Sequence, residues 1–463
     1  MIELLSALEK NKFDLLKVKF MWVEELILDN IKCFEKQNIR FGSTKHAYPW
    51  VTLLGENGAG KSTVLQALAL LLAGPEGAKQ LLIRPEGWLK EESRAGKLTI
   101  RLHQGGASDP GHYGGKKKER KVFQYTFHVT GNEKITVNNK VYTEPVITED
   151  TNSRALPWLR ENALLPKGKG WFGAGYGAFR RLTRENRIIV PSLQTPFRYT
   201  NFFSQFRENE ALEAFETWMV FLDYQISKSN GKDETAKKQQ EWGVAAINKL
   251  LPPGNRFDSI DSNGKIWFQV QGSKVSTVAL SDGFRSVLAL SADLVWRLIE
   301  AFPGSEDPLR EEGVVLIDEL DIHLHPSWQR SIAGLLREIF PNIQFIMATH
   351  SPLVAAGAGQ DAVTYRFYRK NNSIVIDQIK NIHALSVDKI LQSDAFGLVS
   401  QFSEETQKRI DRYYVLKKKN KLSLQESQEL QQTLPFVEQS LGYKNNESET
   451  DKKVAEYLKR NLK

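Results

Sequence analysis

Cysteine is nearly absent from this chain, which has a single one, Cys33, among its 463 residues. One thiol excludes a disulfide framework and a zinc site built from several thiolates, and it is typical of a protein from the reducing cytoplasm. The sequence also lacks any run of about eighteen apolar residues, so we expect neither a membrane span nor a membrane partner. Residues 1–20 lack the layout of a signal peptide, and their mixed charges with Leu and Phe at helical spacing predict a docking helix.

The charge balance is only mildly one-sided. The formal net charge of +8 permits contact with nucleic acid without requiring it, so nucleic acid stays open as a partner. The run "GGKKKERK", Gly114 to Lys121, either contacts DNA phosphates or forms a solvated loop. The solvated loop is favoured because exposed charge runs are common. With 41% hydrophobic residues, the chain can build a sizeable core.

Continuous apolar runs that alternate with helical periodicity are the main organising pattern of the chain. This pattern predicts an α/β fold with a mixed or parallel core sheet that helices cover on both faces. The strand-rich stretch from Lys97 to Glu144 adds an antiparallel β subdomain. Five divisions are predicted. They are an N-terminal helical extension (1–20), an N-lobe (21–205), a short helical insert (206–251), a C-lobe (252–402) and a C-terminal helical docking segment (403–463).

A glycine-rich loop between an apolar strand and a helix carries the strongest chemical signal. The stretch "GENGAGKS" fits the phosphate-loop pattern GxxxxGK[ST] at every fixed position. Its glycines let backbone N–H groups surround phosphate oxygens, Lys61 reaches the outer phosphates, and the Ser62 hydroxyl binds Mg²⁺. We therefore expect ATP and Mg²⁺ as cofactors. The predicted ATP-binding residues are Gly55, Glu56, Asn57, Gly58, Ala59, Gly60, Lys61, Ser62 and Thr63.

Two acids follow the buried run "GVVLI", and a histidine follows the next buried run. Asp318 stands at the carboxyl end of the first predicted strand, where we expect it to hold Mg²⁺. Glu319 is placed to act as the base that polarises an attacking water. His350, in "ATHSP", is expected beside the γ-phosphate as a sensor or water-positioning group. Taken alone it would be interpreted as structural, but its order after the acid pair favours the catalytic role.

The stretch "DELDIHLHP" also suggests a metal site. Asp321, His323 and His325 are hard or borderline ligands that stand close together. Because no separate cluster completes a ligand set, a zinc centre is disfavoured.

Ser281 and Gly283 open a predicted helix in "ALSDGFRSVLALSADL". A serine and a glycine at a helix N-terminus indicate an anion site or a cap, and alone the cap is preferred. Together with the phosphate loop, the acid pair and His350 in this order, they resemble the ABC-type ATPase head. The resemblance implies a homodimer or higher homo-oligomer in which two heads sandwich two ATP molecules. It also implies that Ser281 and Gly283 contact the partner's γ-phosphate and that the loop around Asp321 crosses the interface.

Further segments narrow the resemblance within that family. "LDNIKCFEKQNIRF", with Phe34 at a characteristic aromatic position, and "DELDIHLHPSWQ" are similar to segments of the RecF, SMC and overcoming-lysogenization-defect ATPases. This similarity covers residues 21–360, interrupted by 206–251. "GYGAFRRL" and "LSVDKILQSDAFGL" resemble the ATPase subunits of Septu-type and retron-associated antiphage systems. That resemblance implies a separate HNH-type effector nuclease as a partner.

The sequence departs from the family pattern in three respects. No clear glutamine stands at the usual Q-loop position, and Tyr176 to Arg180 either take that role or form a glycine turn. Leu320 follows the acid pair where many relatives have proline. Roughly the last hundred residues lack the acidic strand-end pattern of a Toprim nuclease, which favours a separate effector over an intrinsic nuclease.

The leading hypothesis is a cytoplasmic sensor ATPase, converting ATP and water to ADP and phosphate, that regulates an effector in antiviral defence. ATP binding would drive engagement of the two heads, and hydrolysis would reset them. The alternative is a RecF- or SMC-like repair or recombination ATPase that acts directly on DNA. A third hypothesis is the ATP-binding subunit of a transporter. A neighbouring nuclease or reverse transcriptase gene would favour the first hypothesis, and permease genes would favour the third.

Overall fold

The structure is a computed structural model in which part of the chain is described. The described residues are 21–44, 46–83, 85–103, 122–137, 140–150, 155–162, 172–178, 197–207, 214–371, 373–392, 402–419 and 421–440. The predicted N-terminal helix, residues 1–20, and the basic loop from Gly114 to Lys121 lie outside them, as do Phe179 and Arg180 of the candidate Q-loop. The chain forms two compact units, residues 1–387 and 388–463, whereas the finer domain boundaries stay predictions.

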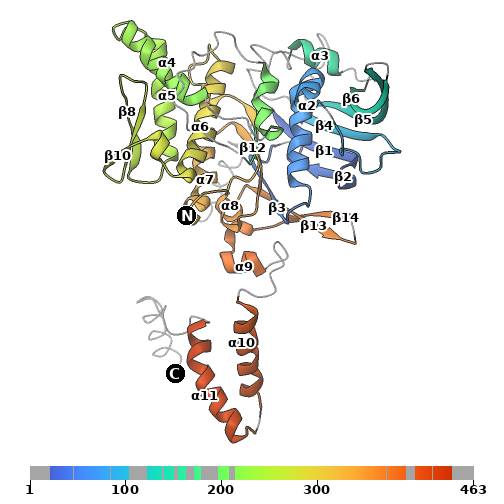
Figure 1. The fold of residues 1–463 in the computed structure, drawn as a ribbon, viewed down its shortest axis with the longest axis vertical. Helices are drawn as coiled ribbons and strands as arrows, with labels where there is room; N and C mark the ends of the chain where they lie inside the picture. Colours follow the sequence, from blue (N-terminus) through green and yellow to red (C-terminus); the bar gives the residue numbers. More distant parts are fainter. Residues whose placement is uncertain are drawn as a thin grey trace, which may run out of the picture. The chain divides into compact units, whose positions relative to one another are not determined.

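The larger unit is built around a six-stranded sheet with the strand order β14-β13-β3-β12-β11-β7. Four of its strands, β14, β13, β3 and β12, are labelled in Figure 1. All neighbouring pairs are parallel except β13 and β14, which are antiparallel. The strands are β3 (Trp50–Gly55), β7 (Phe172–Tyr176), β11 (Gly313–Ile317), β12 (Ile343–Thr349), β13 (Val363–Lys370) and β14 (Ser373–Ile379). Every residue of β3, β11 and β12 is buried, which explains why these strands appear as continuous apolar runs.

Alternate residues of the central strands face two separate hydrophobic cores. On β11, Val314 and Leu316 belong to the core that contains α2, whereas Val315 and Ile317 belong to the core that contains α6 and α7. The helices of this layer are α2 (Lys61–Leu81), α6 (Asp282–Ala301), α7 (Pro326–Ile339) and α8 (Pro352–Gly357). The predicted α/β fold, with a core sheet covered on both faces, is therefore confirmed.

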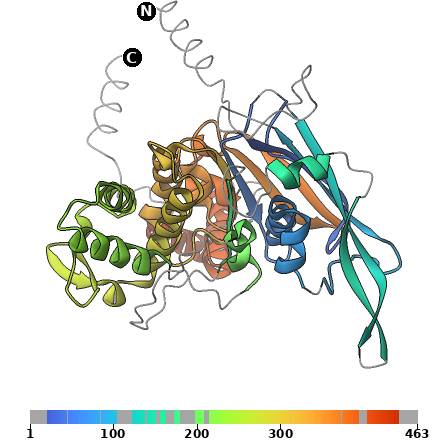
Figure 2. The ribbon, with the colours of Figure 1, turned by 90° about the horizontal axis from the view of Figure 1, so that it is seen from above.

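A second, antiparallel sheet in the same unit has the order β2-β1-β4-β5-β6. Figure 2 shows the larger unit from above, with this sheet in blue to teal. Its strands are β1 (Trp22–Ile31), β2 (Phe34–Arg40), β4 (Gly96–His103), β5 (Val122–Val137) and β6 (Lys140–Glu149). Apolar side chains of β1, β4 and β5, such as Leu26, Ile100 and Phe127, are fully buried and share a core with α2. The helix that follows the predicted phosphate loop is thus packed between two sheets.

Gln344 on β12 connects the two sheets through its side-chain amide. The residue is fully buried, and its Oε1 accepts a hydrogen bond from the backbone N–H of Val23 at 2.8 Å. Its Nε2 lies 2.8 Å from the carbonyl oxygen of Phe41 and 3.3 Å from those of Val23 and Tyr48. A single amide therefore satisfies buried backbone groups from several segments, which fixes the antiparallel sheet against β12.

The remaining elements of this unit surround the core sheet. They are α3 (Ala155–Asn162), η1 (Arg198–Gln205), α4 (Ala214–Lys228), α5 (Glu234–Leu250), β8 (Asn255–Ile260), β9 (Ile266–Val270), β10 (Ser273–Ser276), η2 (Thr277–Ala279), η3 (Pro308–Arg310) and η4 (Ile382–Ala384). Trp218 of α4, Ile247 of α5 and Phe268 of β9 are buried in the same core as α6. The pair α4 and α5 thus supports α6, the helix that begins after Ser281.

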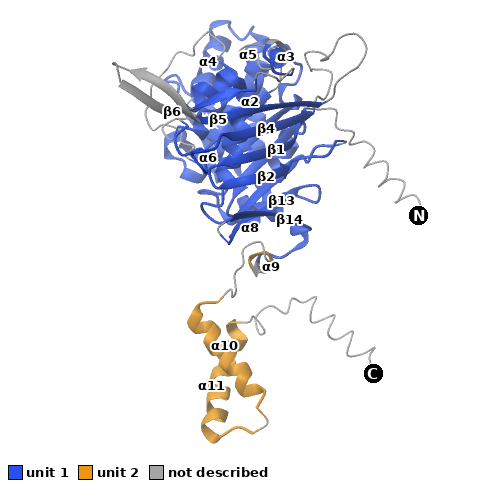
Figure 3. Cartoon of the chain, turned by 90° about the vertical axis from the view of Figure 1, so that its right-hand side faces the viewer, with its two compact units in different colours: residues 1–387 blue, residues 388–463 orange. Residues whose placement is uncertain are grey.

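The smaller unit contains a helical hairpin, shown in orange in Figure 3. Its helices are α10 (Glu404–Lys417) and α11 (Leu424–Ser440), while α9 (Val387–Gln392) spans the boundary between the units. Ile410, Tyr413 and Val437 form a small core of their own, and Arg412 pairs with both carboxylate oxygens of Glu429 at 3.0 and 2.9 Å. None of the described helices is long and apolar enough to cross a membrane.

Candidate active site

The predicted phosphate loop connects the end of β3 to the start of α2. Gly58 and Gly60 have φ values of 74° and 91°, in the left-handed region that other residues rarely adopt. A Cβ atom on Gly60 would lie 2.4 Å from Cζ of Phe34 and 2.7 Å from Sγ of Cys33. The turn between β1 and β2 therefore packs directly against the loop, and at Gly60 only glycine fits both the conformation and the space.

Lys61 is the first residue of α2, and its side chain turns back over the loop. Its Nζ donates hydrogen bonds to the carbonyl oxygens of Gly55 at 2.8 Å and Glu56 at 2.9 Å. Burial lowers the pKa of Lys61, while the negative charges of Asp318 and Glu319 act in the opposite direction. The ammonium group of Lys61 therefore interacts both with the carbonyl oxygens of the loop and with the negative charges of the two acids.

Ser62 and Asp318 supply the oxygen atoms that we predicted to bind Mg²⁺. Ser62 is exposed in the first turn of α2. Asp318 directly follows β11, and its backbone N–H donates a 2.8 Å hydrogen bond to the carbonyl oxygen of Tyr176 at the end of β7. Because β3 and β11 run parallel in one sheet, their carboxyl ends share an edge. A hydroxyl and a carboxylate are hard oxygen ligands, which fits Mg²⁺.

Glu319, the predicted base, has a strained backbone. Its φ of 49° lies in the left-handed region, which costs a non-glycine residue roughly 1–2 kcal/mol. The turn is closed by a 3.3 Å hydrogen bond from the N–H of Ile322 to the carbonyl oxygen of Glu319. Strain of this kind persists where the surroundings enforce it and is concentrated at functional sites.

Asp321 ties the segment after β11 to the end of β12. Its carboxylate accepts a hydrogen bond from the hydroxyl of Thr349 and another, at 3.4 Å, from the backbone N–H of His350. Burial and the charge of Lys61 lower the pKa of His350, while Asp321 and Asp318 act to raise it. The imidazole is therefore neutral at physiological pH. The structure thus brings together Lys61, the acids and His350, which are far apart in the sequence.

Ser281 and Gly283 lie at the start of α6, next to the segment that follows β11. Ser281 is exposed, and its side chain makes no capping hydrogen bond. A Cβ atom on Gly283 would lie 2.3 Å from the carbonyl oxygen of His323. The start of α6 therefore packs on the backbone of the segment that follows the two acids. This contact gives Gly283 a role within its own chain.

His325 has a local structural role. It is the N-cap of α7, where its Nδ1 accepts a 3.3 Å hydrogen bond from the backbone N–H of Ser327. Among the described residues, no group of three or more His, Cys, Asp or Glu side chains could hold a metal ion.

Sequence reasoning missed a glutamine that lies beside β7. A Cβ atom on Gly175 would lie 2.4 Å from Oε1 of Gln205, the last residue of η1. Gln66, one turn after Ser62 on α2, donates a 3.0 Å hydrogen bond to the backbone carbonyl of Gln205. Both amide atoms of Gln205 are buried and have no hydrogen-bond partner among the described residues. Gln205 is therefore a candidate for the Q-loop glutamine.

Tyr176, the first residue of the predicted Q-loop segment, has its side chain against α6. It is fully buried, and its hydroxyl donates a 2.9 Å hydrogen bond to Oδ2 of Asp293 on α6. No sequence pattern marks Gln205, because η1 joins β7 through contacts between residues distant along the chain. The hydrogen bond from Ser204 to the carbonyl oxygen of Gly175, for example, spans 29 residues.

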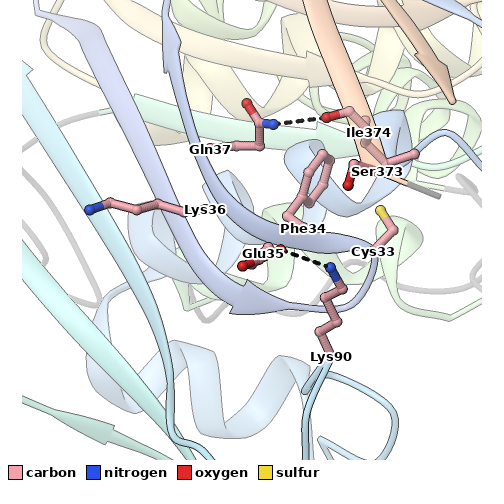
Figure 4. A pocket seen from close by; sticks show the side chains of 8 residues that line it. All are labelled: Cys33, Phe34, Glu35, Lys36, Gln37, Lys90, Ser373 and Ile374. Carbon is pink, nitrogen blue, oxygen red and sulfur yellow. Dashed lines mark hydrogen bonds and ion pairs between the residues drawn. The ribbon is translucent and has the colours of Figure 1, made fainter. Parts of the chain in front are cut away.

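A pocket of about 310 Å³ lies next to the phosphate loop (Figure 4). Cys33 and Phe34 line it, and these two residues also contact Gly60. On one side of the pocket, Nζ of Lys90 lies 3.5 Å from a carboxylate oxygen of Glu35. The pocket is lined by Cys33, Phe34, Glu35, Lys36, Gln37, Lys90, Ser373 and Ile374. The pocket therefore lies between the phosphate loop and β14, the edge strand of the core sheet.

Replacing Gly283 with alanine should destabilise the protein. The new methyl group would overlap the carbonyl of His323, and the resulting shift of α6 should cost about 1–3 kcal/mol. Gly334→Ala on α7 is the matched control, because its Cβ atom would meet nothing within 4 Å, and it should stabilise by about 0.5–1 kcal/mol. Urea unfolding midpoints measure both effects, and equal effects would contradict the close packing of α6.

Comparison with known proteins shows which families and proteins the chain resembles. A family model described as "AAA domain" matches residues 25–250, and one described as "AAA domain, putative AbiEii toxin, Type IV TA system" matches residues 189–356. Among solved structures, an SMC head bound to the C-winged helix domain of ScpA aligns with a TM-score of 0.48 at 17% identity, covering 79% of this chain and 100% of that chain.

Three curated proteins are similar in sequence. The Septu protein PtuA of Bacillus mycoides is 27% identical over 417 residues, which is 88% of this chain and 49% of that protein. The Retron Ec83 probable ATPase of Escherichia coli is 27% identical, with 72% of this chain and 69% of that protein covered. The Retron Vc95 probable ATPase of Vibrio cholerae is 52% identical over 83 residues, with 18% and 16% covered. The chain thus spans about half the length of the Septu relative.

These sequence matches agree with the order of motifs along the chain: the phosphate loop, the serine and glycine that open α6, the acid pair and the histidine. The chain is thus similar in sequence to Septu and retron ATPases, and the two AAA-domain models match it over overlapping stretches.

Proposed function

We propose that this chain is an ATP-hydrolysing sensor ATPase of a bacterial antiviral defence system, which dimerises around ATP and controls a separate effector nuclease. The observation that carries the ATPase activity is the convergence of Lys61, Asp318, Asp321 and His350: the negative charges of Asp318 and Asp321 act to raise the pKa values of both Lys61 and His350. The similarity to proteins named as Septu and retron ATPases supports the role in defence.

ATP binds at the phosphate loop. The backbone N–H groups of the loop and the positive N-terminus of α2 accept the phosphates, and Lys61 exchanges its bonds to loop carbonyls for bonds to the outer phosphates. Ser62 and Asp318 would hold Mg²⁺, which would supply positive charge to the phosphoryl group that is transferred. The pocket lined by Cys33 and Phe34 is next to the loop and takes the ribose and base.

Hydrolysis uses Glu319 and His350. Glu319 accepts a proton from water as the water oxygen bonds to the γ-phosphorus. The bond from the γ-phosphorus to the β,γ-bridging oxygen breaks, and ADP leaves with the electron pair. His350, neutral because burial and the charge of Lys61 lower its pKa, donates a hydrogen bond to a γ-phosphate oxygen.

A second copy of the chain completes each site. The Ser281 hydroxyl is exposed and makes no capping bond, so it is available to a neighbour's γ-phosphate. Val278, just before it, leaves 39% of its surface exposed, which supports a face that becomes covered on association. Ser281 and Gly283 then contact the neighbour's nucleotide, and the loop around Asp321 lies at the boundary between the heads.

Glu319→Gln should separate binding from hydrolysis, because an amide cannot accept the proton from water. We expect an ATP dissociation constant within about threefold of wild type and a kcat lower by about 10² or more. Lys61→Ala is the contrasting variant and should lose ATP binding itself. Titration with ATP and a phosphate-release assay measure the two quantities. A Glu319→Gln protein that turns over at the wild-type rate would remove Glu319 from the mechanism.

Two inactive variants should complement each other if Ser281 acts on a neighbour's nucleotide. Lys61→Ala leaves the Ser281 helix intact, and Ser281→Arg leaves the phosphate loop intact but blocks the approach of the neighbour's γ-phosphate. Random mixing should restore up to about a quarter of normal activity, because mixed dimers contain one intact site. Exchange is verified by co-purifying two differently tagged chains. Mixed dimers whose activity equals the sum of the separate variants would refute the role in trans.

The C-terminal segment, residues 403–463, is proposed to dock the effector. Helices α10 and α11 form a hairpin with its own core and leave Val415 and Leu424 54% and 79% exposed. A chain ending at residue 402 should therefore hydrolyse ATP normally and lose co-purification with an HNH nuclease co-expressed from the same locus. Retained co-purification would assign the docking surface to the larger unit, and loss of ATP hydrolysis would show that the hairpin supports the head.

A further inference from the structure

A buried carboxylate in the middle of α6 belongs to none of the motifs. Asp293 is fully buried, and its Oδ2 accepts hydrogen bonds from the hydroxyl of Tyr176 at 2.9 Å and from Nε of Arg297 at 2.5 Å. Arg297 also donates a hydrogen bond to Oδ1 of Asn201 at 2.5 Å. Asn201 in turn donates to the carbonyl oxygen of Gly173 on β7 at 3.0 Å. The group therefore joins α6 to β7 and η1.

Stability alone gives a poor explanation for this group. A buried ion pair is costly to desolvate, and well-packed apolar residues often replace one without loss of stability. Oδ1 of Asp293 is buried and has no hydrogen-bond partner among the described residues, so the carboxylate is only partly compensated. Burial and the charge of Asp293 raise the pKa of Tyr176 well above its usual value, which keeps the phenol protonated as a donor.

Tyr176 links two parts of the site through its two ends. Its hydroxyl contacts α6, whereas its carbonyl oxygen accepts the backbone N–H of Asp318 at 2.8 Å. The helix that Tyr176 holds begins after Ser281, and Asp293 lies about 18 Å further along it. A helix transmits displacement along its axis, so a shift at Ser281 reaches Asp318 through the side chains of Asp293 and Tyr176, the hydrogen bond between them and one backbone hydrogen bond.

We propose that Tyr176 is a positioning residue: together with Asp293 and Arg297, it fixes the register between α6 and the strand end that carries Asp318 and Glu319. The two acids then hold their reactive positions only while α6 is seated against β7. This inference rests on the proposed ATPase activity. It adds a residue that contacts neither nucleotide nor metal and acts through the backbone of Asp318.

The test compares Tyr176→Phe with Tyr125→Phe. Tyr125 is also a buried tyrosine with one hydroxyl hydrogen bond, to the carbonyl oxygen of Leu71 at 2.5 Å, but it lies in the core shared by α2 and the antiparallel sheet. Each variant loses one buried phenol hydrogen bond, and Tyr176→Phe should lower the melting temperature more because its partner is a carboxylate and not a backbone carbonyl. The two variants therefore separate positioning from a structural role by their ATP affinity, kcat and exchange rates rather than by their stability.

For Tyr176→Phe we expect ATP affinity within about twofold of wild type and a kcat lower by about tenfold or more. For Tyr125→Phe both quantities should stay within about twofold of wild type. ATP titration and steady-state phosphate release on the full chain provide the values. Equal kcat values in the two variants would overturn the proposal.

Hydrogen exchange supplies a readout that does not depend on hydrolysis. The amide of Asp318, followed by mass spectrometry in a peptide that covers residues 313–320, should exchange faster in Tyr176→Phe than in wild type. In Tyr125→Phe it should keep the wild-type rate. Equal exchange in the two variants would overturn the proposal whatever the activity. A wild-type chain that hydrolyses no ATP would instead overturn the proposed function, and the exchange comparison would still decide the role of Tyr176.

Discussion

The buried positive charge of Lys61 is the interaction on which the rest of the site depends. An ammonium group removed from water needs opposing charges nearby, and Asp318 and Glu319 provide them. These residues come from distant parts of the chain and meet because β3, β12 and β11 are consecutive parallel strands of one sheet. The order of strands, rather than any single loop, therefore assembles the site. Burial and the charge of Lys61 together lower the pKa of His350.

Much of the fold could be predicted because its decisive pattern is local. The runs "VTLLG", "GVVLI" and "IQFIMAT" are apolar except for Thr52, Gln344 and Thr349, because both faces of β3, β11 and β12 are covered. The contact made by Gln344 could not be predicted in the same way. Nothing near it in sequence calls for a polar residue, and its partner Val23 is 321 residues away.

The residues of the site fall into the same two groups, those that a local sequence pattern predicts and those that it does not. Lys61 and Asp318 could be proposed from spacing, because a phosphate loop and a strand-end acid have fixed sequence patterns. Gln205 and Asp293 have no such pattern. Gln205 belongs to a short 3-10 helix that reaches β7 from outside the sheet, and Asp293 stands between the apolar, buried residues Ala292 and Leu294 of α6. The roles of Gln205 and Asp293 depend on which residues surround them after folding. His325 is the opposite case: its spacing in the sequence suggests a metal ligand, but in the structure it caps a helix.

The close approach of Gly60 to Cys33 and Phe34 means that the phosphate loop is shaped by a turn from another sheet. The turn and the phosphate loop therefore form one packed unit, although they are separate segments of the sequence. In an exchange of segments between members of this family, a loop transplanted without residues 31–34 would meet a surface of the wrong shape. The loop therefore has a consensus sequence of its own but no independent fold, and natural variation in the turn and in the loop should be inherited together.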